Sequence, residues 1–148
     1  MPLAEFDTGI GYSFKVELDG VQLPSVMEVS GLKREVDKIE VKENTADGKF
    51  VIRNMPGRYK AGEITVTRGL NELKSGEDWL KKAMQGQVSD IRKNGAVTIL
   101  DHTGANVVRR YNLLNMWVKS VEAGTLKAGD TSPLTEKWTI CFEDIQPD

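Results

Sequence analysis

The sequence is poor in histidine and cysteine, on which many catalytic and metal sites depend. Its only histidine is His102 and its only cysteine is Cys141, and it has no Gly-rich phosphate loop, HExxH motif or calcium-binding loop. A single cysteine excludes an intrachain disulfide and is typical of the cytoplasm, where we expect synthesis. His102 follows Asp101 in an expected turn, and Cys141 falls mid-strand, away from any helix N-terminus that would activate it. We therefore predict no catalytic residue, no metal site and no cofactor.

An excess of charge and long apolar runs are also lacking. Twenty basic residues against twenty-two acidic ones leave a net charge of −2, which argues against a general nucleic-acid or membrane surface. No apolar run approaches the roughly 20 residues of a membrane span. Residues 1–13 have neither the basic nor the apolar region of a secretion signal. We expect no sequence-specific nucleic-acid binding, no membrane insertion and no N-terminal secretion signal.

The regular segments have mainly the pattern of strands. Residues 12–18 alternate apolar and polar side chains, and Asp19-Gly20 is a strong hairpin signal before a return strand at 21–23. Further strands are predicted at 26–29, 32–43, 63–68, 96–100, 105–121 and 134–145. A chain of 148 residues favours a single domain, 1–148, which includes a flexible N-terminal arm, 1–11. These features predict a mainly β fold, an antiparallel β-barrel or sandwich of six to eight strands.

One helix is predicted, and it flanks the sheets. Ser75 and Asp78 resemble a capping box at its start, and Gly86 provides the stop. Its apolar stripe is expected to face the core, and consists of Trp79, Leu80, Ala83 and Met84.

The stretch Asn44–Gly62 has no regular period. Gly48, Pro56-Gly57 and Gly62 interrupt any helix or strand, and structureless segments of this length are usually functional or disordered. Its apolar content argues against disorder. Four basic residues against one acidic residue give it a local charge of +3 in an acidic chain. We therefore predict an extended loop that docks on another copy of the chain.

The residues of this predicted interface come from the loop and from the acidic strand before it. We expect the basic side chains of one copy to meet the carboxylates of the next. The set comprises Lys49, Phe50, Ile52, Arg53, Met55, Arg58, Tyr59 and Lys60 of the loop, with Glu35, Asp37 and Glu40 of the strand.

Several motifs follow one another in a distinctive order. They are YSFKVELDG and EVSGLKREVDKIEVKE, the Gly-containing basic loop, ITVTRGLN, DWL and the closing KWTICFEDIQP. In order and spacing they resemble the phage tail-tube protein family over nearly the whole chain. Gly31-Leu32 and Thr67-Arg68-Gly69 are the closest matches.

The resemblance implies a structural protein and not an enzyme. This family builds the inner tube of contractile phage tails and of phage-like extracellular contractile injection systems, and it is related in fold to the type VI secretion tube protein. The implied fold is a small β-barrel or sandwich with one flanking helix. Six copies form a ring, and the rings stack into a hollow tube for cargo or DNA. We assign residues 44–62 to the contact between rings.

The implied partners are further copies of the chain and the sheath, baseplate and cap proteins of the same particle. The implied location is a virion tail or a phage-like injection particle, which some systems release from the cell. The lack of a second domain favours the main tube subunit over an initiator. Two alternatives stay open from the residues alone: a monomeric small-ligand-binding β-barrel, and an enzyme that uses His102 or Cys141.

Overall fold

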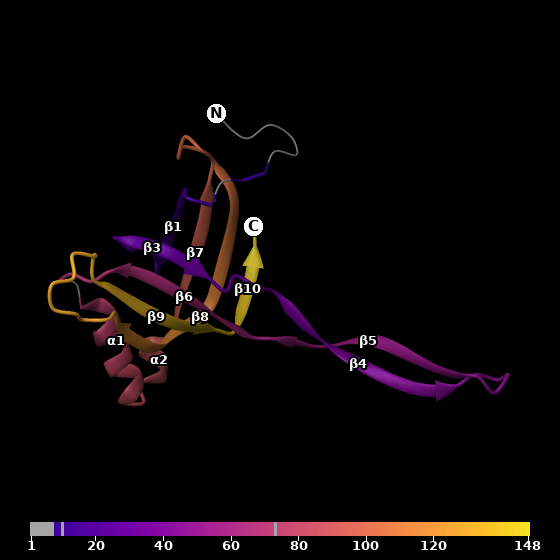
Figure 1. The fold of residues 1–148 in the computed structure, drawn as a ribbon. Helices are drawn as coiled ribbons and strands as arrows, with labels where there is room; N and C mark the ends of the chain where they lie inside the picture. The colour runs from indigo at the N-terminus through magenta and orange to yellow at the C-terminus, as the bar shows by residue number, and fades with distance from the viewer. Residues whose placement is uncertain (1–7, 10, 73) are drawn as a thin grey trace.

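The chain is folded mainly as antiparallel β-structure (Figure 1). The computed structural model describes residues 8–9, 11–72 and 74–148, so most of the predicted arm, 1–11, lies outside the described residues. In chain order the elements are β1 (Phe14–Leu18), β2 (Val21–Gln22), β3 (Val26–Ser30), β4 (Glu35–Asn44), β5 (Phe50–Lys60), β6 (Gly62–Gly69), α1 (Ser75–Met84), α2 (Val88–Ile91), β7 (Lys93–Leu100), β8 (Val107–Ala123), β9 (Thr135–Phe142) and β10 (Asp144–Pro147).

Eight of these strands form one bent sheet that folds into two layers. Its order is β2-β1-β7-β8-β9-β6-β3, with β10 paired to β8. The long strand β8 belongs to both layers, because its first half pairs with β7 and β10 and its second half with β9. The layers cross in an open sandwich and do not close into a barrel (Figure 1). The predicted mainly β, antiparallel fold is confirmed.

The bend in β8 lies at Asn115. This residue has φ 53, a left-handed conformation that asparagine tolerates better than most residues. Its backbone N–H donates to Asn94 Oδ1 at 3.0 Å, and its Nδ2 donates to Glu143 Oε2 at 2.8 Å. Glu143 separates β9 from β10, and its N–H donates to the Leu114 carbonyl at 3.0 Å. The paired strands therefore bend together at one corner of the sandwich.

The first hairpin is the one that the sequence predicts. Asp19 and Gly20 have φ 55 and 82, and positive φ at both central residues is the mark of a type I′ turn. The turn sets β1 against β2, with Leu18 opposite Val21.

The core lies between the two layers and is filled by the inward side of each strand. Its buried side chains include Val16, Val97, Leu113 and Ile145 from one layer and Ile64, Val66, Val118, Trp138, Ile140 and Phe142 from the other. Each strand contributes alternate residues, as the period of a pleated strand requires.

The predicted helix is confirmed as α1, with corrections at both ends. The N-cap is Lys74 and makes no side-chain capping bond, so the predicted cap at Ser75 is wrong. Trp79 is buried, while Leu80 and Ala83 pack against the core as partly buried residues. Met84 is 80% exposed, so its place on the core face is also wrong. At 100° per residue, Met84 lies about 140° around the helix from Trp79, beyond the apolar stripe.

Strands β4 and β5 form a separate two-stranded hairpin that projects away from the sandwich (Figure 1). The expectation of an irregular loop over Asn44–Gly62 is therefore wrong, because most of it is β5. Between the pairs Val36–Tyr59 and Lys38–Pro56, Gly57 and Arg58 oppose the single residue Asp37. Pro56 lies next to this bulge, where proline is tolerated. It also lies in a sheet of only two strands, in which each strand has an edge that needs no N–H donor.

Candidate functional site: the projecting hairpin

The hairpin has two different faces. Directly opposed residues of an antiparallel pair lie on the same side, and sides alternate along each strand. We call one side the aliphatic face; it carries Ile39, Val41, Val51 and Met55. The other side carries Phe50 and Ile52 near the turn, which we call the tip cluster. The register that defines the faces pairs Ile39 with Met55, Val41 with Arg53, Glu43 with Val51, Lys42 with Ile52 and Asn44 with Phe50.

Large apolar side chains of the hairpin are open to solvent. Phe50 is 63% exposed, and the others that are exposed are Val36, Ile39, Ile52, Met55 and Tyr59. A two-stranded hairpin is marginally stable at best without packing on one of its faces. A concentration of exposed apolar groups on one element indicates a surface that a partner covers.

The charges of the hairpin are paired largely with one another. Arg53 Nε lies 2.6 Å from Glu43 Oε1, and Lys60 Nζ lies 3.1 Å from Asp37 Oδ1 and 3.9 Å from Glu35 Oε1. The hydrogen bond to Asp37 and the two carboxylate charges raise the pKa of Lys60. These carboxylates were expected to receive another copy's basic residues, yet they contact the same chain's. The basic residues Arg53 and Lys60 are therefore not free charges seeking a distant partner.

Tyr59 connects the base of the hairpin to the sandwich. Its hydroxyl accepts a hydrogen bond from the backbone N–H of Ile145 in β10 at 3.2 Å. Ile145 is fully buried in the core. Tyr59 therefore holds the hairpin in place within its own subunit, whatever else its exposed ring contacts.

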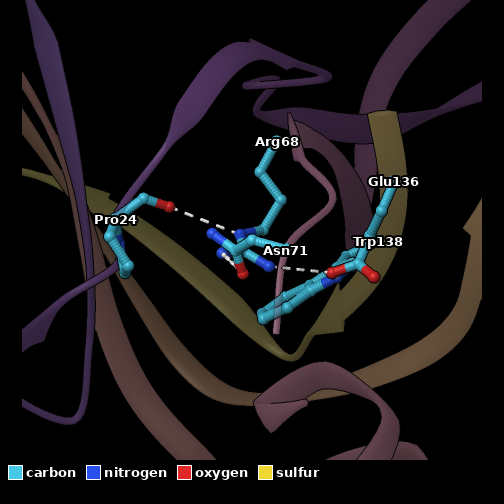
Figure 2. A network of polar contacts seen from close by, with 5 residues as sticks. All are labelled: Pro24, Arg68, Asn71, Glu136 and Trp138. Carbon is cyan, nitrogen blue, oxygen red and sulfur yellow. Dashed lines mark hydrogen bonds and ion pairs between the residues drawn. The ribbon is translucent and has the colours of Figure 1, made fainter. Parts of the chain in front are cut away.

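A second group of polar side chains forms a buried network around Arg68 of β6. Figure 2 shows Arg68 of β6 surrounded by Pro24, Asn71, Glu136 and Trp138. Arg68 has no solvent exposure; its Nη1 donates to Glu136 Oε1 at 3.0 Å and its Nε to the Pro24 carbonyl at 3.3 Å. Trp138 Nε1 donates to the same Glu136 oxygen at 2.6 Å, and the guanidinium lies 5.5 Å from the centre of the Trp138 ring. The network joins β6 and β9 to the segment between β2 and β3.

Neither of the two chemically reactive side chains lies in an active-site arrangement. His102 is exposed in the β7–β8 turn. Burial, followed by the charge of Glu63, raises the pKa of the Cys141 thiol, which favours the unreactive thiol form. Among the described residues, no group of three or more His, Cys, Asp or Glu side chains could hold a metal ion.

Asp101 organises the turn in which His102 lies. Its Oδ1 accepts hydrogen bonds from the Thr103 hydroxyl at 2.6 Å and the Thr103 N–H at 3.1 Å, and its Oδ2 accepts one from Asn106 Nδ2 at 2.9 Å. These bonds hold the pKa of the Asp101 carboxyl well below its ordinary value. Asp101 is therefore structural in this turn.

A lowered pKa in the folded state predicts acid sensitivity. The stabilisation by Asp101 is present above the unfolded pKa of about 3.9 and is lost as the pH falls towards the folded value. In Asp101→Asn the amide Nδ2 would face the donor of Asn106, so we expect lower stability at pH 7 and a flatter dependence below pH ~4. Urea unfolding of both proteins between pH 2.5 and 7, the range set by these pKa values, measures the difference. Parallel curves for the two proteins would contradict this role.

The chain matches one known protein family over most of its length. A family described as T4-like virus tail tube protein gp19 matches residues 11–146. The chain belongs to this tail tube family. The match confirms the family that the sequence motifs indicated. No curated protein sequence matches this tail tube protein significantly.

Solved structures share this fold over 92–100% of the chain. The terminating cap of the anti-feeding prophage tube matches with a TM-score of 0.82 at 22% identity, covering 100% of this chain and 95% of that one. The sheath–tube complex of the PVC extracellular contractile injection system in its extended state matches with 0.81 at 21% identity, covering 97% and 93%. Hcp1 from Flavobacterium johnsoniae matches with 0.55 at 15% identity, covering 92% and 94%. No helix in the described part of the chain is long and apolar enough to cross a membrane.

Sequence reasoning missed the inward position of Arg68 and Glu136. Both were detectable, because Arg68 is in phase with the inward Ile64 and Val66, and Glu136 with the inward Trp138. Opposite charges at inward positions of neighbouring strands predict a buried ion pair.

Proposed function

We propose that this tail tube protein forms rings of six copies and that the rings stack into a hollow tube for the passage of cargo or DNA. The observation that carries the proposal is the projecting hairpin with its exposed apolar side chains. Burying such a side chain fully contributes roughly 1.5–3 kcal/mol, so several together offset the ordering of an exposed ribbon. Membership of the tail tube family supports the same conclusion.

Ring closure requires that one side of a subunit meet a different side of its neighbour. Among the residues that the structure describes, no strand pairs with the outer edges of β2 and β3, the strands at the two ends of the sheet path. Covering such edges with neighbouring copies removes the tendency of exposed edges to aggregate. We propose that stacking uses a second contact of the same kind that does not close, and that the hairpin makes this contact.

The tail tube protein also needs partners in the particle and a place where it works. The solved relatives include a tube-terminating cap, a sheath–tube complex and a baseplate. We propose that this chain likewise meets sheath, baseplate and cap proteins. It is synthesised in the cytoplasm and works in a virion tail or a phage-like injection particle, as a structural protein and not as an enzyme.

The test is the double variant Phe50→Ser/Ile52→Ser. Both side chains are more than half exposed, so their loss leaves the subunit folded and removes apolar contact between copies. We expect folded monomers or single rings and few long tubes in negative-stain electron microscopy, against tubes from the parent.

The matched control is Met84→Ser/Val88→Ser, which removes two exposed apolar side chains from the helical region. It should form tubes as the parent does. Tubes of normal length from the Phe50→Ser/Ile52→Ser variant would show that the tip cluster is not an assembly contact.

A further inference from the structure

The hairpin needs a receiving surface, and the charges described above do not specify one. In β4, Glu35 and Asp37 are already paired with Lys60, and Glu43 with Arg53, of the same hairpin. Lys49, next to the turn, makes no ion pair within the described part of the chain. The tip therefore offers one aromatic ring, Phe50, beside one cation that has no counter-charge.

A groove on the sandwich has the complementary character. It is an open cavity of about 220 Å³ at the mouth between β3 and the β1–β7 pair, with Phe14, Met27, Val29, Leu32 and Ile99 among its lining residues. Among the described residues that line it, Glu28 carries the only charge. An apolar cavity of about 150 Å³ is large enough to bind benzene, so this groove is large enough for a phenylalanine ring.

The hairpin cannot fill the groove of its own subunit. In Figure 1 the hairpin extends away from the sandwich, and its turn is the part farthest from β1, β3 and β7. An occupant from this chain must therefore come from a second copy. The contact joins two different surfaces, so it propagates from copy to copy instead of closing as a symmetric pair.

We propose that Phe50 of one copy inserts into the β1–β3–β7 groove of another copy, with Lys49 against Glu28. This inference rests on the proposed stacking function and names its receiving surface. Phe50 supplies apolar contact, and the Lys49–Glu28 pair fixes the direction in which the tip enters, since rim charges mainly determine specificity.

Disulfide trapping tests the contact directly. In a Cys141→Ser background, Lys49→Cys is combined with Glu28→Cys at the groove, so that Phe50 stays in place; a disulfide requires Cβ atoms about 3.5–4.5 Å apart. The matched control combines Lys49→Cys with Met84→Cys, at an exposed methionine on α1. On mild oxidation of assembled protein, the first pair should give covalent chains of three or more subunits, and the control pair should remain largely monomeric.

Two outcomes distinguish a failure of the groove contact from a failure of tube assembly. Visible tubes in which both cysteine pairs link equally poorly would overturn the groove and leave the proposed function intact. If neither the parent nor the Cys141→Ser protein forms rings or tubes at any concentration tested, the proposed function fails and the docking fails with it.

Charge reversal is a second test that keeps Phe50 in place. Glu28→Lys should raise the protein concentration needed for tube growth several-fold, because it places a cation against Lys49. Adding Lys49→Glu should restore growth, and this rescue is the signature of a direct pair. A double variant no better than Glu28→Lys alone would exclude the pairing.

Discussion

Replacing Arg68 by Met should lower the free energy of unfolding by about 3–5 kcal/mol, the range found when one partner of a buried ion pair is removed. Met retains most of the apolar stem but removes the guanidinium, leaving the Glu136 carboxylate without its cation at 8% exposure. The Pro24 carbonyl also loses its donor. Urea unfolding at neutral pH measures the change.

The control for Arg68→Met is the double variant Arg68→Met/Glu136→Gln. The glutamine side chain that replaces Glu136 would be neutral and would still accept the hydrogen bond from Trp138 Nε1. The double variant should therefore be more stable than Arg68→Met, although it lacks one more native group. A double variant less stable than the single one would show that the carboxylate charge is not the source of the loss.

Replacing Trp79 by Ala should destabilise the fold by about 3–5 kcal/mol, as truncation of a buried aromatic does. Trp79 is 4% exposed, its Nε1 donates to the Ile91 carbonyl at 2.6 Å, and Lys93 Nζ lies 5.3 Å from the ring centre. One side chain thus connects α1 with α2 and the start of β7. For a chain of this size the loss corresponds to a fall in Tm of roughly 10 °C, measurable by calorimetry.

Trp79→Phe separates the packing of the ring from its hydrogen bond. Phe fills most of the same space but leaves the Ile91 carbonyl without its donor, which typically costs about 1–3 kcal/mol. We expect a stability between those of the parent and Trp79→Ala. A Trp79→Ala variant with nearly parental Tm would contradict the central role of this side chain.

The sandwich was predictable from sequence because its strands alternate against a core. Residues 12–18 and 63–68 have this pattern, and both form paired strands close to the predicted bounds. The Asp19-Gly20 turn was predictable for the same local reason, since few residue pairs adopt positive φ twice. Which strands become neighbours was not predicted, because the pairing of β6 with β9 joins segments far apart in sequence.

The first strand of the hairpin, β4, was predicted at 32–43, but β5 was missed because the hairpin has no core to impose a period. Both of its faces meet solvent, so apolar and charged residues mix on each of them. Pro56 and Gly57 looked like breaks, whereas a bulge opposite Asp37 accommodates Gly57, and Gly48 takes φ 81 in the turn. The sequence did indicate that this segment is exposed and apolar. It could not show that Arg53 and Lys60 already have carboxylate partners across the ribbon.

The pairing of β1 with β7 has a consequence for how the chain acquires its structure. Val16 lies opposite Val97, and more than half of the chain separates them. On the ribosome, β1 emerges early and finds only the two-residue β2 until Lys93–Leu100 has been synthesised. Contacts of such long sequence separation make folding slow and leave apolar strands unprotected meanwhile. A nascent chain that stops before Lys93 should therefore depend on chaperones far more than the finished subunit does.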